Sequence, residues 1–251
     1  MPTFIPETTI LVPVDVSDPG RPSASLVELL SPHSVVVLGY YPVPDQSATD
    51  QVRSQFGEEA AAELDGVADR FADAGAAVES VLVFTKDHSE TIGRVAAEHE
   101  ADAVLESDAT SSAESVVPPD RILVSLRGDD NLDEILAFLR ALLSERDAAV
   151  TFLNVTSDDD AEERGEALVR NARDRLLEGL GDRPDPDLIE CRQERDRAPA
   201  ETIVDAADAF DLLVFGESEP SLRERLFGSV TNKVTEASSK PVLIVRNSHE
   251  D

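Results

Sequence analysis

One stretch near the C-terminus has the residue pattern of an anion-binding site. A short apolar run, Leu212–Phe215, ends at Gly216, and Gly228 with Ser229 opens a segment of helical spacing that continues through Val230. A glycine at the carboxyl end of a buried strand, and a glycine-serine pair at a helix start, leave backbone N–H groups free to bind a phosphate. The spacing therefore predicts an anion-binding turn followed by a helix.

Other patterns that carry chemistry are absent from the sequence. The four histidines, His33, His88, His99 and His249, show no metal-ligand spacing and are expected at the surface. The single cysteine, Cys191, has no histidine or lysine near it in sequence to activate it. No nucleophile elbow, P-loop or dinucleotide-binding fingerprint occurs. We therefore expect no enzyme activity and no metal site.

An internal repeat organises the elements that must position this stretch. Ile10–Asp15 recurs as Ile122–Arg127, and Asp102–Leu105 recurs as Asp211–Val214. The resulting period of about 110 residues is one whole small domain, not the unit of a solenoid. Two copies therefore stand in tandem, with Pro118-Pro119 at the seam.

Each copy alternates apolar strands with helical segments, a pattern that gives parallel sheets with helices on both faces. We expect a first domain at residues 1–118, a second at 119–247 and a short tail at 248–251. The first copy is incomplete, because Glu106 stands where the terminal glycine is expected and residues 107–115 are polar. The predicted fold is α/β, with two doubly wound, Rossmann-like domains, the first lacking its last helix and most of its last strand.

The composition is strongly acidic. Asp and Glu number 52 against 22 Lys and Arg, which gives a formal net charge of −30. An acid excess on a chain with ordinary apolar periodicity is typical of a surface hydrated in concentrated salt, and favours a halophile cytoplasm over an acidic interaction protein. No basic stripe exists to bind nucleic acid. No apolar run approaches the ~18–20 residues of a membrane span, so we expect no membrane insertion.

The C-terminal stretch resembles the signature of the universal stress protein family: a strand ending in glycine, a loop written G-x2-G-x9-G-(S/T), a helix and a last strand. Asp211–Gly216, Gly228-Ser229 and Pro241–Val245 match it in order. Glu219 replaces the second glycine, and eight residues separate that position from Gly228. Over both copies, the resemblance implies two tandem UspA-type domains.

In nucleotide-binding members of this family, an Asp at the end of the first strand contacts the adenosine and the glycine loop holds the phosphates. Asp15 matches that Asp in the first copy, which has no glycine loop. The second copy has the frame of the loop, from Gly216 to Val230, but carries Arg127 in place of the Asp. The resemblance therefore implies a vestigial nucleotide site. By its position, Asp15 could equally cap the turn that follows its strand.

The charges around the glycine frame oppose a phosphate. Glu217 and Glu219 follow the strand, and a carboxylate ~5 Å from a phosphate costs on the order of 3 kcal/mol at an effective dielectric near 20. Molar salt would weaken this repulsion, and Arg223 and Arg225 could offset it or pair with neighbouring glutamates instead. The sequence therefore predicts weak or no ATP binding, and no other cofactor.

The resemblance implies a non-enzymatic stress-response or regulatory module. The alternatives are an ATP-binding switch with slow hydrolysis and a cytosolic regulator of a membrane amino-acid transporter. In the family the last strand commonly pairs across a dimer interface. Val242–Val245 could therefore join two chains in a homodimer, or the two copies could form an internal pseudo-dimer.

Overall fold

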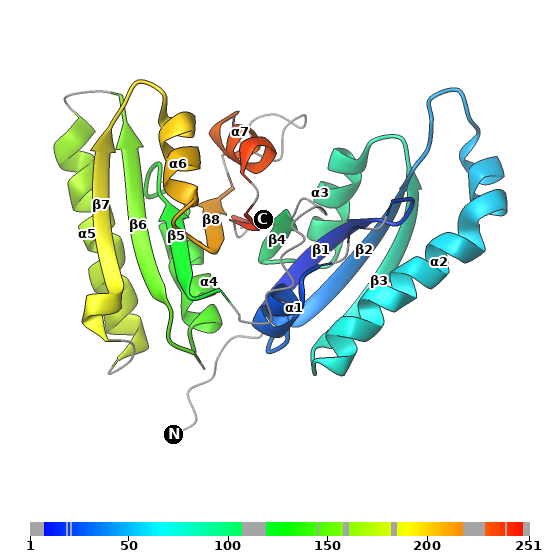
Figure 1. Ribbon diagram of the computed structural model, residues 1–251, viewed down its shortest axis with the longest axis horizontal. Coiled ribbons are helices and arrows are strands. Elements are labelled where there is room, and N and C mark those ends of the chain that lie inside the picture. The colour runs from blue at the N-terminus through cyan, green and yellow to red at the C-terminus, as the bar shows by residue number, and fades with distance from the viewer. Residues whose placement is uncertain are drawn as a thin grey trace. The chain divides into compact units, whose positions relative to one another are not determined.

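The chain folds into two compact units, each built on parallel strands (Figure 1). The computed structural model describes residues 8–18, 20, 22–106, 119–144, 146–157, 161–181, 185–217, 229–238 and 240–247. We call the described residues 8–106 the N-terminal unit and those from 119 onward the C-terminal unit. The short remainder of the last strand that the sequence predicts for the first copy lies outside the described residues.

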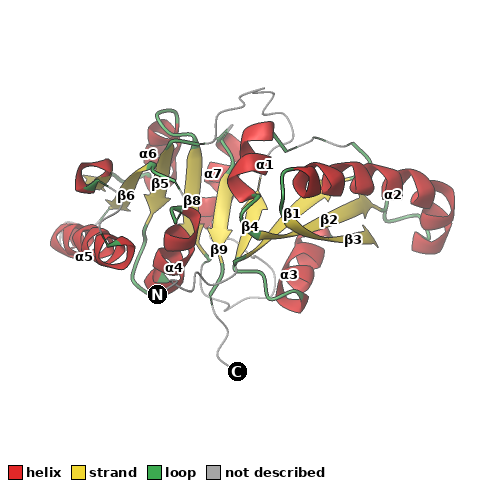
Figure 2. Cartoon of the chain, turned by 90° about the horizontal axis from the view of Figure 1, so that it is seen from below, coloured by secondary structure: helices red, strands yellow, loops and turns green. Residues whose placement is uncertain are grey.

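The N-terminal unit has strands in the order β3-β2-β1-β4, with every pairing parallel. Figure 2 shows α1 and α2 on one face of these strands and α3 on the other. Its elements are β1 (Thr9–Asp15), α1 (Ala24–Leu30), β2 (Ser34–Pro42), α2 (Thr49–Asp73), β3 (Ala77–Thr85), α3 (His88–Glu98) and β4 (Ala103–Glu106).

The C-terminal unit has strands in the order β9-β8-β5-β6-β7, again with parallel pairings. Helices α4 and α5 lie on one face, and α6 and α7 on the other (Figure 2). Its elements are β5 (Arg121–Ser125), α4 (Leu132–Leu142), β6 (Ala149–Thr156), α5 (Glu162–Leu180), the 3-10 turn η2 (Pro186–Leu188), β7 (Ile189–Arg195), α6 (Pro199–Ala207), β8 (Leu212–Gly216), α7 (Ser229–Ala237) and β9 (Val242–Val245). The predicted α/β class with parallel strands is confirmed.

An aspartate anchors the first strand in the same way in both units. Asp102, just before β4, accepts the backbone N–H of Thr9 at 2.8 Å. Asp211, just before β8, accepts the N–H of Arg121 at 3.0 Å. Both carboxylates therefore tie the start of one strand to the start of its neighbour, as the repeat of this Asp in the sequence suggests.

Two helices differ in extent from what the sequence predicts. Helical spacing of apolar residues predicts a helix over residues 55–74, but α2 begins at Thr49, with a polar first turn in which the helix dipole stabilises Asp50. The sequence also predicts a helix over residues 199–210, but α6 ends at Ala207. The N–H of Phe210 bonds the carbonyl of Ala207 at 3.0 Å, so the chain leaves α6 through a tight turn.

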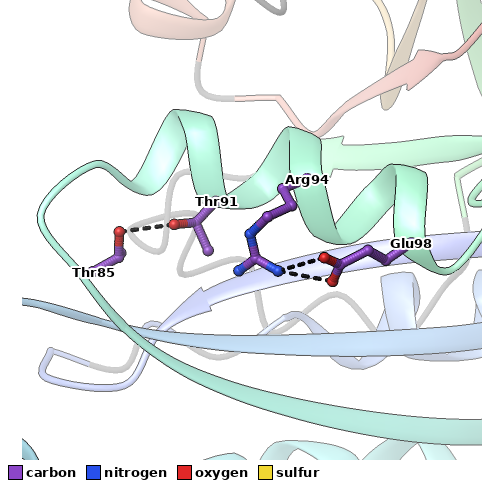
Figure 3. A network of polar contacts seen from close by, with 4 residues as sticks. All are labelled: Thr85, Thr91, Arg94 and Glu98. Carbon is purple, nitrogen blue, oxygen red and sulfur yellow. Dashed lines mark hydrogen bonds and ion pairs between the residues drawn. The ribbon is translucent and has the colours of Figure 1, made fainter.

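The start of α3 shows how polar side chains fix a βα connection (Figure 3). The Thr91 hydroxyl donates to Thr85 Oγ1 and lies 2.8 Å from it, and Asp87 caps the helix by accepting the N–H of Glu90. Further along, Arg94 donates to both carboxylate oxygens of Glu98 at 2.8 Å. This exposed ion pair supports the solvent face of α3 and adds little stability.

Candidate functional site

A pocket of about 380 Å³ lies at the carboxyl ends of β5 and β8. The chain leaves β5 toward β6 and leaves β8 toward β9, in opposite directions across the sheet. Such a reversal opens a crevice beyond the strand ends, where ligands bind in open α/β sheets. The lining comes from the ends of β5, β6 and β8, the first turns of α4, α6 and α7, and the segment after β9.

Gly216, the last residue of β8, packs directly against a side chain from the start of α4. Asn131 precedes α4, is 7% exposed, and donates from Nδ2 to the carbonyl of Val245 at 3.2 Å. A Cβ on residue 216 would overlap Asn131 Oδ1 and Cγ. The close approach of Asn131 therefore requires glycine here. Sequence reasoning missed Asn131, although an Asn before an apolar periodic segment is a helix-start signal.

Glu217 is held in place at the pocket edge. Its Oε2 accepts the backbone N–H of Asn247 at 3.1 Å and lies 3.9 Å from Arg246 Nε. The side chains of Arg246 and Glu217 are only 10% and 13% exposed. The negative charge expected beside Gly216 therefore lies at the pocket edge, where Arg246 partly balances it. Glu219, Arg223 and Arg225 lie outside the described residues.

Only some of the site residues predicted from the sequence line this pocket. Arg127 is exposed, lines the pocket and makes no ion pair with another described residue. Gly216 and Val230 line the same pocket. Ser229 begins α7, while Gly228 lies outside the part of the chain that the structure describes.

Asp15 belongs to the N-terminal unit, so it does not join the pocket of the C-terminal unit. It ends β1, and its Oδ1 accepts both the N–H and the hydroxyl of Ser17, at 2.8 and 2.6 Å. The carboxylate therefore caps a turn, the second of the two roles open to it from the sequence.

A comparison of the sequence with protein-family models identifies the family of this chain. The universal stress protein family model matches residues 119–246, just over half of the chain. The chain belongs to the universal stress protein family. A search of curated proteins returned no match.

Solved structures that match nearly the whole length of this universal stress protein share its fold. A universal stress protein from Archaeoglobus fulgidus is 15% identical, with 97% of each chain covered and a TM-score of 0.65. A functionally unknown protein from Pseudomonas aeruginosa is 12% identical over 96% of this chain and 93% of its own, with a TM-score of 0.52. A universal stress protein in complex with cAMP is 26% identical over 52% of this chain and 98% of its own, with a TM-score of 0.39.

The N-terminal unit of this universal stress protein carries an acidic side chain near the matching strand end. Strand register pairs Ile10 with Ala103 and Ile122 with Leu212, so Glu106 corresponds to Phe215. The expectation that Glu106 replaces the terminal glycine was wrong by one residue. Glu106 follows Asp102 by four residues, as Phe215 follows Asp211, whereas Gly216 follows Asp211 by five.

Burial at this position perturbs two titratable groups. It raises the pKa of Glu106 from 4.5 to about 7. Burial also raises the pKa of Tyr40 to about 12, and the carboxylates of Asp15 and Glu106 add to the effect. The Tyr40 ring stacks on His88 with ring centroids 5.6 Å apart. The carboxylates of Asp15 and Glu106 thus act on Tyr40 near the carboxyl ends of the strands in this unit.

The other groups considered from the sequence fall into structural roles. His33 is 7% exposed, so the expectation of a surface position was wrong for it. His99 pairs with Glu79 at 3.3 Å. Burial raises the pKa of Cys191, whose thiol donates to the carbonyl of Val169 at 3.2 Å. Among the described residues, no cluster suits a metal ion, and none of their helices is long and apolar enough to cross a membrane.

Proposed function

We propose that this chain is a non-enzymatic regulatory module of the stress response, with tandem domains at residues 1–118 and 119–247. We further propose that the pocket of the C-terminal unit is a vestigial nucleotide site that binds ATP weakly or not at all. The observation that carries the proposal is the charge of its described lining, which holds one basic side chain, Arg127, and two carboxylates, Asp130 and Glu217.

The electrostatic energies of the lining argue against tight binding of a triphosphate. A phosphate ~5 Å from either carboxylate would cost on the order of 3 kcal/mol at an effective dielectric near 20. The N-termini of α6 and α7 face the pocket through Pro199 and Val230, but each would return only about 0.3–1 kcal/mol. Arg127 can offset the repulsion from Asp130, and Arg246 partly balances Glu217. The described lining therefore supplies no net positive charge to hold a group that carries several negative charges.

Isothermal titration calorimetry with Mg-ATP in molar KCl tests this proposal. We expect a dissociation constant in the millimolar range or no measurable heat, and a micromolar constant would overturn the proposal. Asp130→Asn is expected to tighten ATP binding about tenfold, because it removes one repulsive charge whose effect molar KCl reduces to roughly half of the unscreened value. Glu166→Gln is the matched control, since Glu166 is a partly exposed acid on α5 that pairs with Arg170 away from the pocket.

Two further parts of the proposal concern surroundings and assembly. The net charge of −30 supports a salt-rich cytoplasm. Strand β9 pairs with β8 through Val242–Val245, and we propose that its other edge pairs with a second copy of the chain or forms an internal pseudo-dimer with the first domain. Light scattering in molar KCl tests this point. A stable dimer would favour pairing between chains, and a monomer would favour the internal arrangement.

A further inference from the structure

We propose that the pocket of the C-terminal unit binds a small zwitterion with an apolar body, of which an apolar α-amino acid is the simplest example. The inference rests on the proposed function, because it uses the same pocket and names what that pocket would take in place of a triphosphate. It stands on the size of the pocket, its apolar walls and the arrangement of its few charges.

The size and walls of the pocket suit a small apolar group. Its volume of about 380 Å³ lies near the lower end of the range for ligand pockets, roughly 300–1,000 Å³. Six apolar side chains line it, from strands, helices and the segments next to them: Leu126, Ile135, Val155, Ile203, Phe215 and Val230. Four of these, Leu126, Ile135, Ile203 and Phe215, are only 2–4% exposed and form the floor, so the partly exposed Val155 and Val230 offer most of the apolar surface. Such walls favour a branched aliphatic side chain.

One side of the pocket favours a carboxylate. Arg127 has no ion-pair partner among the described residues, so its guanidinium can bind a ligand carboxylate through two hydrogen bonds. Pro199 and Val230 bring the first turns of α6 and α7, each helix nine residues long, to the same lining. Their N-terminal partial positive charge adds to the preference for a single negative charge.

The other charges of the lining favour an ammonium group. Asp130 makes no ion pair in the described part of the chain, so its carboxylate can accept from a ligand. Glu217 shares its charge with Arg246 and the Asn247 N–H, and adds a second, weaker acceptor at the pocket edge. A ligand ammonium can therefore find acceptors that would repel a second carboxylate or a phosphate.

The opposite charges follow the ends of two neighbouring strands and line the same pocket. Ser125 on β5 pairs with Phe215 on β8, and Arg127 and Glu217 each follow that pair by two residues, just beyond the strand ends. Neighbouring strands lie about 4.8 Å apart. An α-amino acid carries both charges on one carbon, so it can meet both sides of the pocket at once. A simple acid leaves the carboxylates unpaired, and a simple amine leaves Arg127 unpaired.

Calorimetric titration of the full chain in molar KCl tests the inference. The probes are L-leucine, 4-methylpentanoate, which lacks the amine, 3-methylbutylamine, which lacks the carboxylate, and glycine, which lacks the apolar body. We expect saturable binding of leucine, with each of the other three probes binding at least about tenfold more weakly. No saturable binding of leucine at millimolar concentration, or equal binding of 4-methylpentanoate, would overturn the inference.

Variants separate the two ends of the ligand. Arg127→Gln and Asp130→Asn change exposed side chains, so both should fold, and each is expected to weaken leucine binding about tenfold. Arg170→Gln, an exposed arginine on α5 away from the pocket, is the control for net charge and should leave binding unchanged. Unchanged leucine affinity in both pocket variants would refute the assignment.

The same titrations distinguish failure of this inference from failure of the proposed function. Tight Mg-ATP binding would overturn the proposed weak nucleotide site whether or not leucine binds. Absence of leucine binding, together with weak ATP binding, would overturn the zwitterion inference alone.

Discussion

Glu106→Gln is the substitution for which the structure gives the clearest magnitude. Glu106 ends β4 at the position that buried Phe215 takes in the other unit. Burial raises its pKa from 4.5 to about 7. Between these two values, the folded protein therefore holds a proton on Glu106 that the unfolded chain releases.

The sign of the pH dependence follows from this difference. Between pH 4.5 and about 7 the folded state binds more protons than the unfolded state, so the free energy of unfolding falls as pH rises. The contribution of Glu106 is fully present below pH 4.5 and is lost as pH rises through about 7. The two pKa values correspond to a loss of about 3 kcal/mol. Glutamine stays neutral and should not show this loss.

The assay is urea unfolding followed by far-ultraviolet circular dichroism in molar KCl, from about pH 4 to pH 8. We expect the variant and the wild type to have similar free energies of unfolding near pH 4. The variant should become more stable than the wild type by about 3 kcal/mol near pH 8. Glu98→Gln is the matched control, because Glu98 is exposed on α3 in the same unit. A difference that stays constant with pH would refute the reasoning.

Three other predictions concern stability. Gly216→Ala should destabilise the fold by about 1–3 kcal/mol, because the new Cβ overlaps Asn131; urea unfolding measures this, and an unchanged midpoint would contradict it. Asp102→Ala should cost about 1–2 kcal/mol, since the start of β1 loses the acceptor of the Thr9 N–H; the same assay applies, with Asp73→Ala, an exposed acid at the end of α2, as control. Transfer from molar KCl to dilute buffer should unfold the chain through self-repulsion at a net charge of −30, and a dichroism spectrum unchanged by dialysis would rule this out.

Local sequence patterns predict the strands and most of the helices. Val242–Val245 was predicted to the residue, because a parallel strand buried on both faces must be a continuous apolar run. Gly181, with φ of 67°, ends α5 as expected, since glycine adopts this backbone conformation without strain. These features depend on residues that are close together in the chain.

The tertiary structure alone decided how the pocket is built. Asn131 reaches the carbonyl of Val245, 114 positions away, and Glu217 is held by Arg246 and Asn247 across two strand ends. The burial of Glu106, which raises its pKa, likewise depends on the folded sheet. Local patterns specify which residues form a strand or a helix, but the partners of a polar side chain at a strand end depend on which strands lie side by side, and that is a property of the folded sheet.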